Sequence, residues 1–219
     1  MAVLEDIVYS NPNKNPTIDS DESFYSLPFY KDEEYFSVLE NYVTFIKSVE
    51  ALVRNSKYYK RYIAYIKTDA GLNFCQVLSN IDEQDESDDL LEMHHGPILT
   101  LFDYVSIVID DLLYRKKPIN TFIVADIIIK EHMENNVQVV MLTETVHQLY
   151  HATGKPFINV RQAFGDLNRF LTKYKYGLQP DQINKINRYI ASSMKYDSFD
   201  GGLLKLKENI QKWGYTEVY

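Results

Sequence analysis

Residues 137–155, VQVVMLTETVHQLYHATGK, change from a strand-like to a helix-like pattern within a few positions. Five of the first six residues are apolar and three of them are valine, a composition typical of a short buried strand. Thr143 is a suitable N-cap, so a short helix is predicted over Glu144–Ala152, with Gly154-Lys155-Pro156 ending it. Because most other segments have helical apolar spacing, the chain is predicted to be α+β, mainly helical, with a small strand element in the middle.

The segments on both sides of this stretch are predicted to be mainly helical. Apolar spacing predicts helices over Asp32–Asn55, Ile98–Arg115, Thr121–Glu134, Val160–Tyr176, Pro180–Met194 and Leu203–Trp213. The helix over 121–134 is so apolar that we expect burial on most of its sides. The basic, tyrosine-rich segment Lys57–Lys67 fits either a helix or a strand. Two short strands, Asn73–Ser79 and Leu90–His94, are predicted to pair as a hairpin, with the acidic run of Asp82–Glu92 as its loop.

Length and composition fit a globular protein with one core. The chain has 219 residues, of which 45% are hydrophobic. No window approaches the roughly 18 continuous apolar residues of a membrane span, so no membrane partner is expected. The N-terminus lacks a basic region followed by a long apolar stretch, and secretion is not expected. The single cysteine, Cys75, fits a reducing cytoplasm and excludes zinc sites built on paired cysteines.

The formal charge of −8 is unevenly distributed. Residues 1–92 carry 18 acidic and 8 basic side chains, whereas residues 93–219 carry 13 acidic and 15 basic ones. The acidic N-terminal part is therefore a candidate docking segment for a protein partner. A local basic patch for nucleic acid could come from the second part, although such residues also occur on ordinary solvated helix faces. The candidates are Arg115, Lys116, Lys117, Lys155 and Arg161.

All five histidines lie between His94 and His151. His94 and His95 are neighbours at a predicted strand end, where adjacent side chains point to opposite faces. His147 and His151 share one face of the predicted helix, a common spacing for two ligands of one metal ion. Gln148 stands where the zinc-protease motif needs a glutamate, and no Gly-rich phosphate loop or G-x-S-x-G motif occurs.

The order of these motifs resembles that of the HNH (His-Me finger, ββα-metal) endonuclease family. That family has a His-His pair followed by small or proline residues, and later a helix with L-x4-H-x3-H. Here the two parts are His94-His95-Gly96-Pro97 and the stretch from Leu142 to His151. The longer segments that contain these motifs, LEMHHGPILTLFD and VHQLYHATGK, are similar to segments of uncharacterised tailed-bacteriophage proteins.

The resemblance implies a small central ββα-metal element, and together with composition and apolar spacing it divides the chain into four parts. Residues 1–30 would be an extended acidic arm, and residues 31–70 an N-terminal helical segment. Residues 71–160 would be the ββα-metal-like core, with a two-helix insertion over 98–134. Residues 161–219 would be C-terminal helices packing on that core. The expected location is the cytoplasm, that of the host cell for a phage protein.

The resemblance also implies roles for individual residues. His94, His147 and His151 would hold one divalent ion, zinc, nickel or magnesium, of which three imidazoles suit zinc or nickel better. His95 would be the general base that takes a proton from water. The implied function is metal-dependent hydrolysis of phosphodiester bonds in DNA. Gln138 stands where the family has an asparagine that orients the base, and the insertion makes the span from His95 to His147 about twice the usual length.

Two other hypotheses remain open. The chain could be a catalytically inactive HNH-fold phage protein with an interaction, structural or regulatory role, which the acidic N-terminal part favours. Alternatively, a purely structural zinc site would need a fourth ligand, for which His132 and Asp103 are the candidates. Inside its apolar helix, His132 is expected to be structural. Most of the 18 tyrosines are expected in the core or at interfaces, although such rings can stack on bases.

Overall fold

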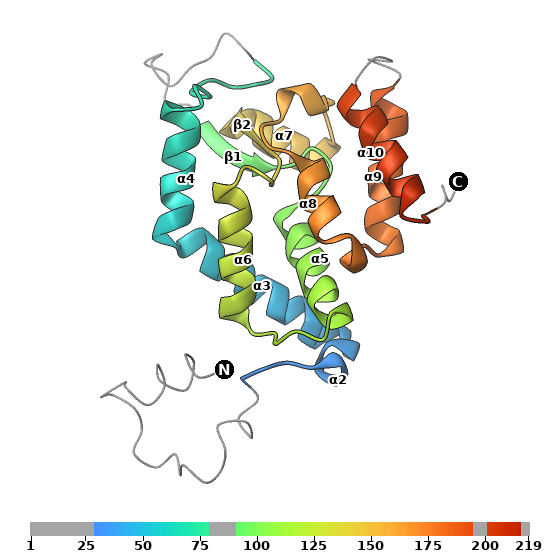
Figure 1. Ribbon diagram of the computed structural model, residues 1–219. Helices are drawn as coiled ribbons and strands as arrows, with labels where there is room; N and C mark the ends of the chain where they lie inside the picture. Colours follow the sequence, from blue (N-terminus) through green and yellow to red (C-terminus); the bar gives the residue numbers. More distant parts are fainter. Residues whose placement is uncertain (1–28, 79–90, 195–200, 216–219) are drawn as a thin grey trace.

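The computed structural model describes residues 29–78, 91–194 and 201–215 (Figure 1). These residues are mainly helical with one two-stranded antiparallel sheet, which confirms the predicted α+β class. Nearly all of the predicted arm and of the predicted acidic loop lies outside the described residues. The elements are α2 (Glu33–Ser37), α3 (Leu39–Asn55), α4 (Lys57–Thr68), β1 (Leu91–His95), α5 (Leu101–Tyr114), α6 (Thr121–Met133), β2 (Val139–Thr143), α7 (Glu144–Thr153), η1 (Val160–Gln162), α8 (Leu167–Lys173), η2 (Lys175–Gly177), α9 (Pro180–Ser193) and α10 (Gly201–Lys212).

In the sheet β1 pairs with β2, and His94 lies opposite Val140. The helices α5 and α6 lie between the two strands in the sequence. The predicted hairpin between residues 73–79 and 90–94 is therefore wrong, and the described residues 73–78 form no strand of the sheet. All five residues of β2 are buried, so the second edge of this strand also needs hydrogen-bond partners. Gln76 supplies them: its backbone N–H donates to the Met141 carbonyl at 2.9 Å, and its Oε1 accepts from the Met141 N–H at 2.7 Å.

Helix α5 is the most buried helix beside the sheet. It begins at a capping box between Thr100 and Asp103 and packs against α3, α6 and η2. Figure 1 shows α5 and α6 running side by side away from the sheet. The prediction that the 121–134 helix is buried on most sides is confirmed. α6 contacts α3, α4 and α5, and its exposed residues follow a single stripe that includes Phe122, which is 61% exposed.

Two predicted helices are interrupted. The helix over 32–55 breaks at Val38, whose extended backbone separates α2 from α3. The helix over 160–176 breaks into η1, α8 and η2. The break follows from Phe164, which exchanges two backbone hydrogen bonds with Val139 of β2, and from Gly165, whose φ of +110° and approach to the Val137 carbonyl leave no room for a Cβ atom.

The remaining local predictions agree with the structure. Lys57–Lys67 is helical, as α4, and Thr143 caps α7 by accepting a hydrogen bond from the Val146 N–H. Cys75 is fully buried. The buried apolar side chains form one cluster that extends from α2 to α10. Among the described residues, no helix has the length and apolar character needed to cross a membrane.

Candidate metal centre

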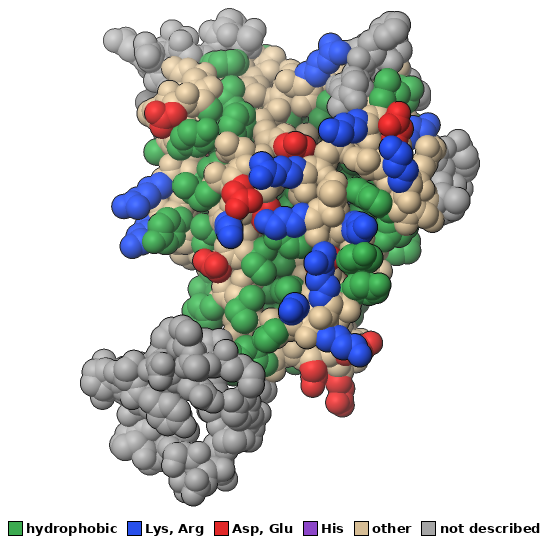
Figure 2. Space-filling view, in the orientation of Figure 1, with side chains coloured by type: hydrophobic (Ala, Val, Ile, Leu, Met, Phe, Trp, Pro, Cys, Tyr) green, Lys and Arg blue, Asp and Glu red, His purple; other side chains and the backbone are tan. Residues whose placement is uncertain are grey.

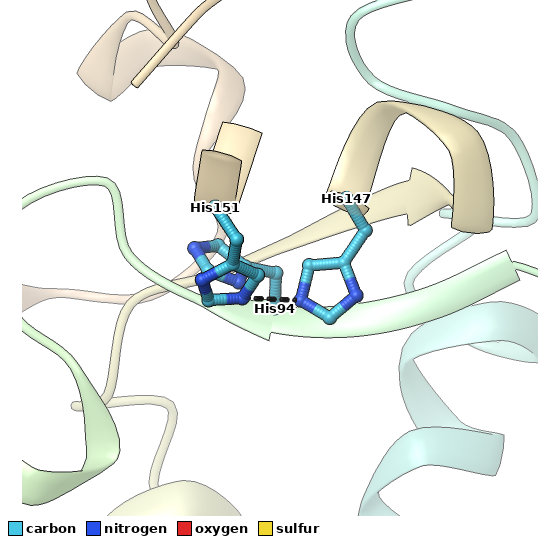
Figure 3. Close-up of side chains that lie close together, drawn as sticks. All are labelled: His94, His147 and His151. Carbon is cyan, nitrogen blue, oxygen red and sulfur yellow. Dashed lines mark hydrogen bonds between the residues drawn. The ribbon is translucent and has the colours of Figure 1, made fainter. Parts of the chain in front are cut away.

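Three histidines from β1 and α7 converge on one point. His94 is the fourth residue of β1, and His147 and His151 lie one turn apart on α7, which packs against that strand. One ring nitrogen from each histidine lies within 4.8 Å of the other two. His147 Nε2 and His151 Nε2 lie 2.9 Å apart. Figure 3 shows the three rings pointing toward one another from the strand and the helix.

This arrangement fits a transition-metal ion. In a tetrahedral zinc site with Zn–N distances of 2.0–2.1 Å, ligand nitrogens lie about 3.3 Å apart. To accept the ion, His147 Nε2 and His151 Nε2 would move apart by about 0.4 Å, and the widest nitrogen pair would close by no more than about 1.5 Å. Three protein ligands leave one coordination position open, which is the pattern of catalytic zinc sites. The described residues add no fourth ligand to the group.

Neither candidate fourth ligand lies in this group. The Asp103 carboxylate caps α5 and accepts from Lys185 Nζ at 2.7 Å. His132 pairs instead with His95. A closed four-ligand zinc site therefore has no support from the described part of the chain.

Glu92 orients His147. Its carboxylate accepts a hydrogen bond from His147 Nδ1, so the lone pair of that ring lies on Nε2, which faces His151. A carboxylate behind a metal-binding imidazole fixes the tautomer and makes the ligand more basic. Sequence reasoning missed this residue, although Glu92 precedes His94 by two positions and therefore points to the same face of β1.

The local electrostatics favour the metal-binding form of His94. Its side chain is 6% exposed, and burial lowers its pKa from 6.5 to about 4, with His147, His151 and Arg54 acting in the same direction. The ring is therefore neutral at pH 7, and a neutral imidazole is the form that binds a metal. His147 is only half-buried and His151 is exposed, so the cluster is accessible from solvent.

A cavity of about 150 Å³ adjoins the three histidines. Glu50 and Arg54, one turn apart on α3, form part of its wall together with His95 and Thr100. Arg54 is a second residue that sequence reasoning missed, because nothing near it in the sequence links α3 to the histidines. A guanidinium beside an open coordination position suits an anionic ligand, since arginine binds carboxylate and phosphate oxygens in a fork.

His95, the predicted base, is 5% exposed and pairs with His132. Their Nε2 atoms are 2.9 Å apart, and His132 Nδ1 lies 2.7 Å from the Ile128 carbonyl. Because a carbonyl can only accept, His132 Nδ1 carries the proton and donates to it. In the neutral ring, His132 Nε2 is then unprotonated. His95 Nε2 must then donate to His132, which puts the lone pair of His95 on Nδ1. Burial lowers the pKa of His95 well below its usual value.

The structure does not bring Gln138 to the cavity that the histidines line. Its backbone N–H donates to the Tyr104 hydroxyl at 2.9 Å, and its backbone carbonyl accepts from the Gly96 N–H at 3.2 Å. The side chain borders a different cavity, shared with Arg161. The described hydrogen-bond partner of His95 is thus His132.

The predicted nucleic-acid contacts do not gather around the histidines. Arg115–Lys117 follow the C-terminus of α5, whereas Thr100, before its N-terminus, borders the histidine cavity. Because α5 has 14 residues and rises 1.5 Å per residue, Arg115–Lys117 lie about 20 Å from the end of α5 that borders the histidine cavity. Arg115 is also held by Asp111, with Nε 2.6 Å from the carboxylate. Lys155 follows the end of α7, and Arg161 borders the Gln138 cavity.

Comparison with known proteins gives one result. A family model described as Bacteriophage G278-like virion protein matches residues 1–213. No curated protein and no solved structure matches the chain.

Proposed function

The chain belongs to the Bacteriophage G278-like virion protein family, and from this premise we propose that it is a component of the phage particle that hydrolyses phosphodiester bonds in DNA at a one-metal, HNH-type site. The observation that carries the proposal is the convergence of His94, His147 and His151 beside a cavity that also holds Arg54. β1 pairs with β2, α7 follows β2, and α5 and α6 lie between the two strands in the sequence, which is the order that the sequence resemblance, with its two-helix insertion, implies.

Each residue around the cavity would have a separate task. The three histidines would hold a divalent ion, which supplies Lewis-acid stabilisation of the charge on the phosphate. Glu92 would keep His147 in the metal-binding tautomer. Arg54 would bind a phosphate oxygen and position the diester.

His95 would take a proton from water, and on the tautomers described above it would do so at Nδ1. Its lowered pKa keeps the ring neutral at pH 7 but also makes it a weaker base than an exposed histidine.

One observation favours a second candidate function. His95 is buried between α4 and α6: its ring stacks on Tyr59 at 6.1 Å and hydrogen-bonds to His132. A histidine with these contacts can serve simply to pack β1 against two helices. The metal would then only join β1 to α7, in a catalytically inactive virion protein that binds a protein partner through its acidic N-terminal part.

Metal content and DNA cleavage separate the two candidates. We would purify the full chain, measure metal per chain by mass spectrometry, and assay nicking of supercoiled plasmid with magnesium, manganese, nickel or zinc. His147→Ala removes a ligand, and His95→Ala removes the proposed base. Gln148→Ala is the matched control, because Gln148 lies on the same helix and bonds to Glu144.

The nuclease proposal expects nicking by the wild type and by the control. His147→Ala should lose both the metal and nicking, whereas His95→Ala should keep the metal and nick about 10²–10⁴-fold more slowly. A metal-loaded wild type that nicks no faster than His95→Ala with every ion overturns the nuclease proposal and leaves the second candidate. A protein that binds no metal overturns both.

A further inference from the structure

The end of α5 remote from the histidines presents two stacked, exposed tyrosines. The rings of Tyr114 and Tyr176 lie 4.5 Å apart with an interplanar angle of 10°, yet the two residues are 64% and 45% exposed. Two cations flank the pair: the Arg115 guanidinium lies 5.4 Å from the Tyr176 ring centre, and Lys175 Nζ lies 5.0 Å from it. Large exposed rings beside unburied cations are characteristic of surfaces that bind a ligand having both a flat apolar face and negative charge.

The end of α10 extends this surface. Lys212 and Trp213 line a pocket of about 230 Å³ together with Lys175, Tyr176 and Tyr215. The Tyr215 hydroxyl donates to the Lys175 carbonyl at 3.2 Å and so ties the end of α10 to η2. We call this surface the aromatic–basic face, and it comprises Tyr114, Arg115, Lys116, Lys117, Lys175, Tyr176, Lys212 and Trp213.

Positive charge continues beyond this face into the groove between α8 and α10. The groove has a volume of about 460 Å³ and contains Arg169, Lys173 and Lys205, with Asp166 as its one acidic residue among those described. Lys173 is paired with the buried Glu131, so Arg169 and Lys205 are the cations that remain for a ligand. Figure 2 shows Lys and Arg side chains gathered over α5, α8 and α10, with hydrophobic side chains between them.

We propose that the aromatic–basic face binds single-stranded nucleic acid. The lysines would neutralise backbone phosphates, and unstacked bases would stack on Tyr114, Tyr176 and Trp213. Single strands fit better than duplex, because the rings can reach base faces only where the bases are free. The inference does not depend on the metal site, which lies about 20 Å away along α5.

The test is fluorescence anisotropy of a labelled 20-nucleotide oligothymidine with the full-length protein in EDTA, at salt concentrations from 50 to 200 mM. Tyr176→Ala should weaken binding at least about 5-fold, since one base–ring stack is worth about 1–3 kcal/mol. Lys175→Gln and Lys212→Gln should each lower the slope of log K against log salt by about 0.7. Wild-type affinity should be the same in EDTA and in added zinc, which separates this face from the metal site.

Tyr58→Ala is the matched control. Tyr58 is 47% exposed and also has two cations close to its ring, Lys57 Nζ at 5.2 Å and Arg61 at 5.9 Å, but no second ring stacks on it within the described residues. The Tyr58→Ala variant should bind the oligonucleotide with the same affinity as the wild type. Tyr114→Ala repeats the test at the other ring in case Tyr176→Ala lowers the melting temperature.

Three results would overturn the proposal. The first is no binding at 50 mM salt, and the second is binding that neither tyrosine variant weakens relative to the Tyr58→Ala control. The third is sedimentation data in which the wild type self-associates, Tyr176→Ala does not, and the oligonucleotide fails to bind. That last result would make this face an interface between copies of the chain.

Discussion

Metal binding at the proposed site should raise the thermal stability of the protein, because the three proposed ligands join β1 to α7. A ligand that binds only the folded chain at 100 times its Kd adds about 2.7 kcal/mol to the free energy of unfolding. For a chain of this size, that corresponds to a rise in melting temperature of about 5–11 °C. His147→Ala removes one of the three ligand atoms and should abolish the rise.

Glu92→Gln is the more discriminating change, because it leaves all three ligands in place. Losing the carboxylate behind His147 should weaken metal affinity about 10- to 100-fold. At the same zinc concentration, the gain in stability then falls from about 2.7 to about 1.4–0.4 kcal/mol. The zinc-induced gain in stability of Glu92→Gln should therefore lie between that of the wild type, which is full, and that of His147→Ala, which is zero.

The assay is scanning calorimetry of each variant in EDTA and in zinc at 100 times the wild-type Kd. Gln148→Ala, on the same helix, should show the full rise. Equal zinc-induced rises in His147→Ala and the wild type would refute the assignment of the ligands. A full rise in Glu92→Gln would refute the role of Glu92.

Three further changes test the fold around the site. Burial raises the pKa of Asp110 from 3.8 to about 6, so its ionisation costs nothing below pH 4 and up to about 3 kcal/mol above pH 6. Asp110→Asn, which can still accept from Tyr42, should therefore match the wild type in denaturant melts at pH 4 and exceed it at pH 7; equal stability at both pH values would contradict this. Glu131 is fully buried and accepts from the Tyr174 hydroxyl at 2.6 Å. Glu131→Ala should cost about 3 kcal/mol in urea unfolding, and a loss below about 1 kcal/mol would show that these contacts matter little. A Cβ atom on Gly177 would lie 1.9 Å from a backbone oxygen of α5, so Gly177→Ala should cost about 3 kcal/mol or more, and an unchanged melting temperature would contradict that close packing.

Short-range signals predicted much of the helical structure. The Thr143 cap and Pro180 at the start of α9 act within one turn of the chain, and both helices begin where these residues indicate. Long-range pairing was harder to predict. Residues 73–79 and 139–143 have similar apolar composition, and composition alone does not tell which of them pairs with β1. The break before α8 likewise depends on Phe164 reaching β2.

The same distinction holds for the histidines. The spacing of His147 and His151 on one helix predicted that their nitrogens would meet, and the structure places His94 with them. The partners supplied by distant elements could not be predicted from spacing. His132 reaches His95 from α6, and Arg54 reaches the cavity from α3. Neither contact has a counterpart in the local sequence pattern.

X-ray absorption of the zinc-loaded full-length protein would show whether three imidazoles hold one metal ion. We predict one zinc per chain, with a first shell of nitrogen and oxygen at about 2.0–2.1 Å and the outer-shell scattering of imidazole rings. A first shell containing sulfur at about 2.3 Å, or a spectrum unchanged in His147→Ala, would contradict the claim.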